Sequence, residues 1–316
     1  MLTTISMAIK EAHIMLMPQS ILVVISGKHK EHEALQRALT FAEHNNTHIH
    51  LLNVMFEPVT QLIDVFSIEH CKEMKRQCLA ERFEYLNAIA LDLGKKGIKC
   101  TVQVEWEPEI QKAIKQVVDE LEPDLVIKRI SADQLSINPF ALPIDRYLLR
   151  FCDAPLLLVK HSNWTASPIL AAVDVLATDE QHIELNKDVL ESAKLIAHLS
   201  SSELHVVSSY ITHSVSAAID FSNIDLDTIN ANSARYHQEK LNSLELEQLV
   251  DNNKNHVLAG VPEQAIPNVT KQINAQLVVL GTVARKGMSG ALIGNTVESV
   301  LAELNCEVLV VKHKAL

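Results

Sequence analysis

The residues best suited to hold a small anionic ligand lie in one segment, GTVARKGMSGALIGNTVESVLAEL, residues 281 to 304, which contains four of the chain's eight glycines. Glycines between a buried strand and a helix let backbone N–H groups approach a ligand, and a helix that begins near Asn295 offers free N–H groups and a positive dipole end. Thr296 adds a hydroxyl in the first turn. Asp174, which follows an earlier strand, could accept hydrogen bonds from a ribose or a base, although its simpler interpretation is a turn former. The pattern predicts a phosphate site.

Catalytic and metal-binding patterns are not found in the sequence. There is no GxSxG, no HExxH and no Ser-His-Asp order, and no general base can be named, so we predict no catalytic residue. His48 and His50 alternate on a predicted strand and would share a face, but no third ligand has a recognisable spacing, so we predict no metal site. The five cysteines are scattered without a CxxC pair, which predicts reduced thiols.

Composition limits the class of protein and of partner. With 316 residues, 47% hydrophobic and 21% charged, the chain can bury a sizeable core and by length predicts about two domains. A net charge of -11 argues against nucleic acid and anionic membranes as partners, and favours a small-molecule ligand. No apolar run is long enough for a membrane span, and charged residues interrupt the first 20 residues, so we predict a cytoplasmic protein.

The elements that must position the glycine segment follow from the apolar pattern. Short continuous apolar runs, typical of strands buried on both faces, alternate with longer amphipathic stretches, typical of helices. The predicted strands are 21–26, 48–54, 99–105, 124–128 and 154–160, then 169–175, 203–210, 255–260, 276–282 and 307–312. The predicted helices are 31–45, 67–93, 108–120 and 143–152, then 182–199, 229–250, 262–273 and 295–305. This alternation predicts parallel sheets with helices on both faces.

The two halves of the chain follow one plan. Ile21 corresponds to Ile169 and Lys160 to Lys312, so the order and spacing of the strands repeat almost unchanged. We therefore predict two tandem, doubly wound, five-stranded parallel-sheet domains of the α/β class, at residues 20–160 and 168–314. The polar segment HSNWTAS between them is the predicted linker.

The run LVVLGTVARKGMSGALIGNTVESVLAELNCEVLVVK resembles the closing signature of the universal stress protein family, and the two-domain length resembles its tandem members. The resemblance implies an adenine-nucleotide alpha-hydrolase-like fold. In nucleotide-binding members the signature is G-x2-G-x9-G-[ST], a loop that holds the phosphates of ATP, and an Asp after the first strand contacts the nucleoside. The matching positions here are Gly281, Ala284 for the second Gly, Gly294, Asn295 for the Ser or Thr, and Asp174.

Two of these positions depart from the family pattern. Ala284 restricts a backbone conformation with positive φ, and Asn295 supplies an amide where the pattern has a hydroxyl. The expected ligand is therefore ATP, a related nucleotide or another anionic small molecule, and Arg285 could add positive charge if it is not simply a solvated loop residue. The candidate ligand-binding residues are Asp174, Gly281, Thr282, Ala284, Arg285, Gly294, Asn295 and Thr296.

The first half lacks this site. In place of Gly281, Gly294, Asn295 and Asp174 it has Arg129, Leu142, Pro143 and Ser26. We therefore predict a structural or partner-binding first domain and a degenerate nucleotide loop.

The resemblance implies a stress-response protein that acts by binding rather than by catalysis, with its ligand in the second domain. Two alternatives stay open. One is an apolar or lipid-like ligand in a second-domain cavity covered by residues 211 to 226, and the other is a slow ATP hydrolase.

The last strand of each half, 154–160 and 307–312, would be a bare sheet edge if left unpaired. In single-domain members of the family this edge mediates dimers. The resemblance thus implies that the two edges pair within one chain, so that a monomer forms an intramolecular pseudo-dimer, and a further homodimer stays open.

Overall fold

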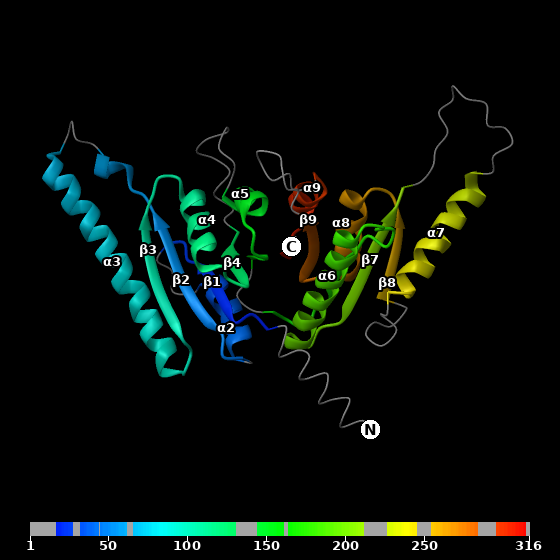
Figure 1. The fold of residues 1–316 in the computed structure, drawn as a ribbon, viewed down its shortest axis with the longest axis horizontal. Coiled ribbons are helices and arrows are strands. Elements are labelled where there is room, and N and C mark those ends of the chain that lie inside the picture. Colours follow the sequence, from blue (N-terminus) through cyan, green and yellow to red (C-terminus); the bar gives the residue numbers. More distant parts are fainter. Residues whose placement is uncertain are drawn as a thin grey trace. The chain divides into compact units, whose positions relative to one another are not determined.

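The structure is a computed structural model that describes residues 17–27, 32–43, 45–61, 66–130, 144–160, 164–211, 226–244, 254–283 and 295–313. The chain divides into two compact units, residues 1–163 and residues 164–316 (Figure 1). The packing of one unit against the other, and with it the pseudo-dimer, stays a prediction. Within the described ranges, no helix has both the length and the apolar character needed to cross a bilayer.

Unit 1 has a parallel sheet whose strands follow the order β3-β2-β1-β4-β5. Its described elements are β1 (Ser20–Val24), α2 (Glu33–Ala42), β2 (His48–Met55), the 3-10 helix η1 (Pro58–Gln61), α3 (Ile68–Lys95), β3 (Cys100–Trp106), α4 (Ile110–Leu121), β4 (Leu125–Arg129), α5 (Ile144–Phe151) and β5 (Leu156–Val159).

Unit 2 repeats this topology with the order β10-β9-β6-β7-β8, again parallel throughout. Its described elements are β6 (Ile169–Ala172), α6 (Glu180–Leu199), β7 (Leu204–Tyr210), α7 (Leu226–Asn242), β8 (Asn255–Ala259), α8 (Pro262–Ile273), β9 (Leu277–Val283), α9 (Asn295–Glu303) and β10 (Glu307–His313). The predicted fold class of two tandem doubly wound domains is confirmed.

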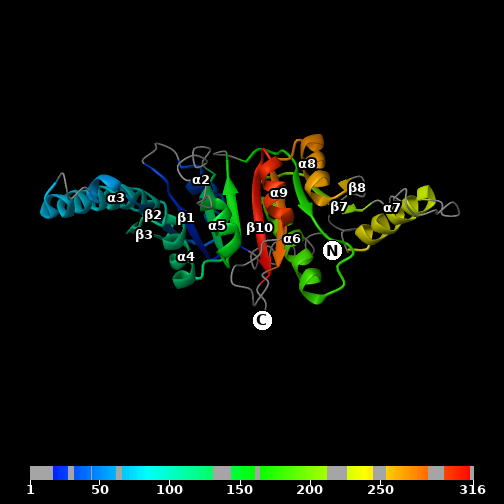
Figure 2. The same ribbon diagram turned by 90° about the horizontal axis from the view of Figure 1, so that it is seen from above.

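Helices cover both faces of each sheet. In Figure 2, α2 and α3 lie on one side of the unit 1 sheet and α4 and α5 on the other. This division follows from right-handed crossovers, because the chain moves outward in one direction from β1 to β3 and in the other from β4 to β5. The strand order of each unit therefore reverses between two central strands, β1 and β4 in unit 1 and β6 and β9 in unit 2.

The predicted first strands, 21–26 and 169–175, are longer than the observed β1 and β6. Each backbone makes one more ladder bond beyond the strand, from Ile25 N to Leu52 O at 2.8 Å and from Val173 N to Val207 O at 3.0 Å. After that bond the chain leaves the sheet toward the next helix. In unit 2 this departure exposes Asp174 at the carboxyl edge of the sheet.

The start of unit 2 is held by two side chains, one of which follows the left-handed cap of α8. Asn274 (φ 51) ends α8, and Gln276 then donates from Nε2 to Thr165 O at 2.6 Å and to Ser167 O at 2.8 Å. Trp164 donates from Nε1 to Oε2 of Glu307, a residue only 1% exposed, at 2.8 Å. The last residues of the predicted linker are thus part of unit 2, and residues 161–163 lie outside the described residues.

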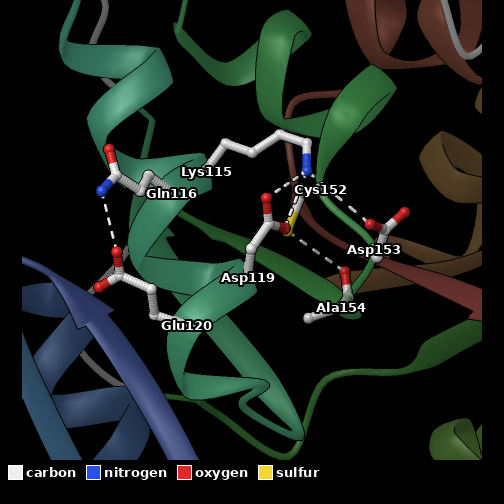
Figure 3. A network of polar contacts seen from close by, with 7 residues as sticks. All are labelled: Lys115, Gln116, Asp119, Glu120, Cys152, Asp153 and Ala154. Atoms are coloured by element: carbon white, nitrogen blue, oxygen red, sulfur yellow. Dashed lines mark hydrogen bonds and ion pairs between the residues drawn. The ribbon is translucent and has the colours of Figure 1, made fainter.

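A polar network on the α4 and α5 side of unit 1 holds α4 against the chain that follows α5 (Figure 3). Lys115 Nζ lies 2.7 Å from Asp119 Oδ2 and 3.8 Å from Asp153 Oδ2. Burial opposes the charge of Lys115, but the hydrogen bond and charge of Asp119, with the charge of Asp153, leave its pKa raised. Cys152 is buried and donates from Sγ to Ala154 O at 3.6 Å.

Candidate functional site

A cavity of about 400 Å³ lies in unit 2 at the carboxyl ends of β6, β7 and β9. This is where the strand order reverses, which is the place where doubly wound sheets bind ligands. Its polar lining residues are Asp174, His182, Ser208, Ser209 and Thr282. The rest of the lining consists of two glycines, Gly260 and Gly281, and of Ala172, Val173, Leu185, Val207, Ile211, Pro262, Ile266, Leu280, Val297 and Val300. The cavity therefore has apolar walls with a few polar groups, as small-molecule sites do.

Asp174 is fixed at the edge of this cavity from two sides. Its Oδ1 accepts a hydrogen bond from Leu176 N at 2.9 Å, which forms the turn expected of an Asp after a strand. Asn186 of α6 accepts from Asp174 N at 3.1 Å and donates from Nδ2 to Asp174 O at 2.7 Å. The second carboxylate oxygen, Oδ2, makes no hydrogen bond to any described residue, so the turn does not use up the carboxylate's capacity to accept from a ligand.

Gly281 lies in β9 beneath α6, and its structural role differs from the one that its motif position suggests. A Cβ at this position would lie 2.6 Å from Leu185 Cγ, far inside van der Waals contact. Glycine here therefore lets α6 pack closely against the sheet, and this packing brings the first turns of α6 to the cavity. Thr282, the next residue, is buried and lines the cavity.

The remaining predicted residues lie after β9. Ala284, Arg285 and Gly294 lie outside the described residues. Asn295 and Thr296 form the first two positions of α9, as predicted, and the structure describes their backbone alone. Because Val297 and Val300 of the same helix line the cavity, the first turn of α9 borders it.

His182 lines the cavity and was missed by the sequence analysis. It is the third residue of α6, and Asp179, the N-cap, accepts a hydrogen bond from its backbone N at 3.1 Å. The ring Nδ1 lies 2.7 and 2.8 Å from the two oxygens of the same carboxylate. These hydrogen bonds, that of the ring first, hold the pKa of Asp179 below its usual range. The pattern Asp-x-x-His at a predicted helix start, a few residues after Asp174, was the available signal.

Unit 1 has an ion pair where unit 2 has apolar cavity wall. The register that matches Lys160 with Lys312 matches Lys128 with Leu280 and Asp145 with Val297. Lys128 is fully buried, and its Nζ forms an ion pair with Asp145 Oδ1 at 2.7 Å. Nζ also donates to Arg129 O at 2.9 Å.

The neighbouring positions in unit 1 are also charged or exposed. Arg129, which stands opposite Gly281, pairs with Glu33 at the start of α2, with Nε 3.0 Å from Oε1. Ser26, which stands opposite Asp174, is exposed. Leu142 and Pro143 lie outside the described residues. Along its described part, this region of unit 1 is therefore built from ion pairs in place of apolar wall and glycine.

One histidine pair lies on β2 of unit 1, and another joins β7 to β8 in unit 2. The rings of His48 and His50 are 3.9 Å apart, so these residues do share a face of β2. In unit 2, His205 Nδ1 lies 2.9 Å from His256 Nε2. Burial is the largest cause that lowers the pKa of all four rings, which favours their neutral forms. Among the described residues, no group of three or more His, Cys, Asp or Glu side chains is arranged to hold a metal ion.

Two observations bear on the reactivity of the five cysteine thiols, all of which lie among the described residues. Cys71, Cys152 and Cys306 are buried. Burial also raises the pKa of Cys100 to about 11, so its nucleophilic thiolate form is scarce at neutral pH.

Comparison with known proteins identifies the family. The universal stress protein family matches this chain twice, over residues 17–160 and 167–312. Universal stress protein E of Escherichia coli K12 is 30% identical over 301 residues, which cover 94% of this chain and 95% of that protein. A universal stress protein E homolog of Haemophilus influenzae is 29% identical over 300 residues, covering 93% and 97%.

Among solved structures, a functionally unknown protein from Pseudomonas aeruginosa PAO1 superposes with a TM-score of 0.71, at 30% identity over 94% of both chains. Each family match covers most of one unit, and the relatives align along nearly their whole length. This chain belongs to the universal stress protein family, as a tandem of two of its domains.

Proposed function

We propose that this chain is a cytoplasmic stress-response protein that acts by binding, and that the cavity of unit 2 takes a nucleotide or another anionic small molecule. The observation that carries the proposal is the cavity itself, because it combines apolar walls, the carboxylate of Asp174 and the first turn of α9 at one sheet edge. A volume of about 400 Å³ lies within the range of ligand pockets.

The lining suits the parts of a nucleotide. A base would pack on the apolar walls formed by Val207, Ile211 and Ile266. The carboxylate of Asp174 can accept hydrogen bonds that ribose hydroxyls donate. The N–H groups of the first turn of α9 favour a phosphate, because a helix N-terminus combines free donors with a positive dipole end.

Unit 1 supports the proposal by contrast. It has the same fold, but Lys128 and Asp145 take the places of Leu280 and Val297. We therefore expect one ligand per chain, bound in unit 2.

The test is calorimetric titration of the full chain with ATP, ADP and AMP. We expect binding at a stoichiometry near one, weakened by Asp174→Asn, which keeps an acceptor for Leu176 N but removes the charge. Glu203→Gln, at the opposite edge of unit 2, is the matched control and should bind as the native chain does. Absence of heat with all three nucleotides at millimolar concentration would remove the nucleotide proposal.

A second candidate, an apolar or lipid-like ligand, is favoured by one observation: of the seventeen described residues that line the cavity, ten carry apolar side chains. Native mass spectrometry of freshly purified protein distinguishes the two. A co-purifying mass of lipid size supports this candidate, whereas a nucleotide mass supports the first.

A further inference from the structure

His182 stands at the mouth of the cavity in an orientation set by its own helix. Asp179 caps α6 and accepts from both the backbone N and the ring Nδ1 of His182. The side chain of His182 is 47% exposed, and the residue lines the cavity. The ring is thus held in place without being buried.

The contact with the Asp179 carboxylate occupies Nδ1 and leaves Nε2 as the ring nitrogen available to a ligand. A carboxylate can only accept, so Nδ1 carries the proton of the neutral ring and Nε2 carries a lone pair. Nε2 makes no hydrogen bond to any described residue. When the ring takes up a second proton, the proton goes to Nε2, which changes from an acceptor into a charged donor.

Because of the charges around His182, protonation of its ring should affect how tightly an anion binds. Of the described residues that line the cavity, the titratable ones are Asp174 and His182, since those that β7, α8, β9 and α9 contribute are uncharged. Asp179 lies beside the ring and is charged at neutral pH, because its hydrogen bonds from His182 hold its pKa below the usual range. With a neutral ring, two carboxylates oppose an incoming anion, and with a charged ring one of them is offset.

We infer that His182 is the ionisable contact of the unit 2 site, through which the cavity binds anionic ligands more tightly as pH falls from 8 to 5.5. The inference rests on the proposed anionic ligand. It adds a ligand-contacting residue and a pH dependence that neither Asp174 nor the glycine segment provides. Asp179 has a positioning role, because it acts through the ring.

The experiment compares the native chain with His182→Gln by calorimetric titration with ATP, without divalent metal, at pH 5.5, 6.5 and 8.0. Because the ligand's own protonation affects both proteins equally, the ratio of the two dissociation constants isolates the contribution of the ring. A charge-assisted contact at a half-exposed site predicts a ratio of about ten at pH 5.5 and near one at pH 8.0.

His198→Gln is the matched control, because His198 is an exposed histidine in the last turn of the same helix. Its ratio should stay near one at every pH.

The outcomes separate the two proposals. No ATP binding by the native chain at any pH refutes the proposed function and this inference together. Binding with a ratio that does not change with pH, or an equal loss in His198→Gln, refutes this inference and leaves the proposed function standing.

Discussion

Replacement of Asp145 by Val tests whether the Lys128–Asp145 ion pair takes the place of a cavity wall in unit 1. The change leaves the ammonium of Lys128, whose side chain is 1% exposed, without its counter-charge. Loss of one partner of a buried pair typically destabilises by about 3 to 5 kcal/mol. Asp145 retains 16% exposure and Lys128 still donates to Arg129 O, so we expect the lower end, a loss of about 3 kcal/mol.

The double variant Lys128→Leu/Asp145→Val gives unit 1 the residues that unit 2 has at Leu280 and Val297. Replacement of a buried pair by apolar residues of similar size is often neutral or stabilising, so we expect a free energy of unfolding within about 1 kcal/mol of the native value. Lys128→Leu alone should cost less than Asp145→Val alone, because the carboxylate it leaves is nearer to solvent.

Urea unfolding followed by circular dichroism measures the free energies, and hydrogen-exchange mass spectrometry assigns the loss to peptides of unit 1. The three variants close a double-mutant cycle, in which the sum of the two single losses should exceed the loss in the double variant by at least about 2 kcal/mol. A loss below about 1 kcal/mol in Asp145→Val, or a double variant no more stable than that single one, would refute the reasoning.

Two further predictions concern unit 2. Gly281→Ala places a methyl group 2.6 Å from Leu185 Cγ, so overpacking should lower the free energy of unfolding by about 1 to 3 kcal/mol in urea titrations. The added substitution Leu185→Ala should relieve that clash, and an unchanged midpoint in Gly281→Ala would contradict the packing role of the glycine. Burial lowers the pKa of His205 and His256 in the folded state, so the unfolded chain binds more protons between the lowered value and the ordinary value near 6.5. The stability that these rings contribute is therefore full above pH 6.5 and is lost as pH falls through that window. Urea unfolding at pH 7.5 and 5.0 should show this loss of stability, and His256→Gln should make the loss smaller. A midpoint that does not change with pH would rule out the contribution of these rings.

The fold and the place of the candidate site in it could be predicted from the sequence because both depend on local patterns. Strands buried on both faces appear as continuous apolar runs, and their alternation with helices leaves few topologies. The repeat that relates Ile21 to Ile169 gave two equal domains, and the rule for doubly wound sheets placed Asp174 and Gly281 at the same edge. The structure brings both to one cavity.

What only the tertiary structure decided are contacts between side chains far apart in sequence. The need for glycine at 281 comes from Leu185, almost a hundred residues earlier, because the distance between α6 and β9 depends on how the helix packs. The sequence shows a lysine at 128 and an aspartate at 145, but not that Lys128 and Asp145 meet in a buried ion pair. His182 lines the cavity of the candidate site because α6 packs closely on the sheet, and Asp179 orients its ring. Apolar periodicity records which face of an element is buried, whereas the atoms that meet across that face depend on the distances and rotamers set by packing the whole domain.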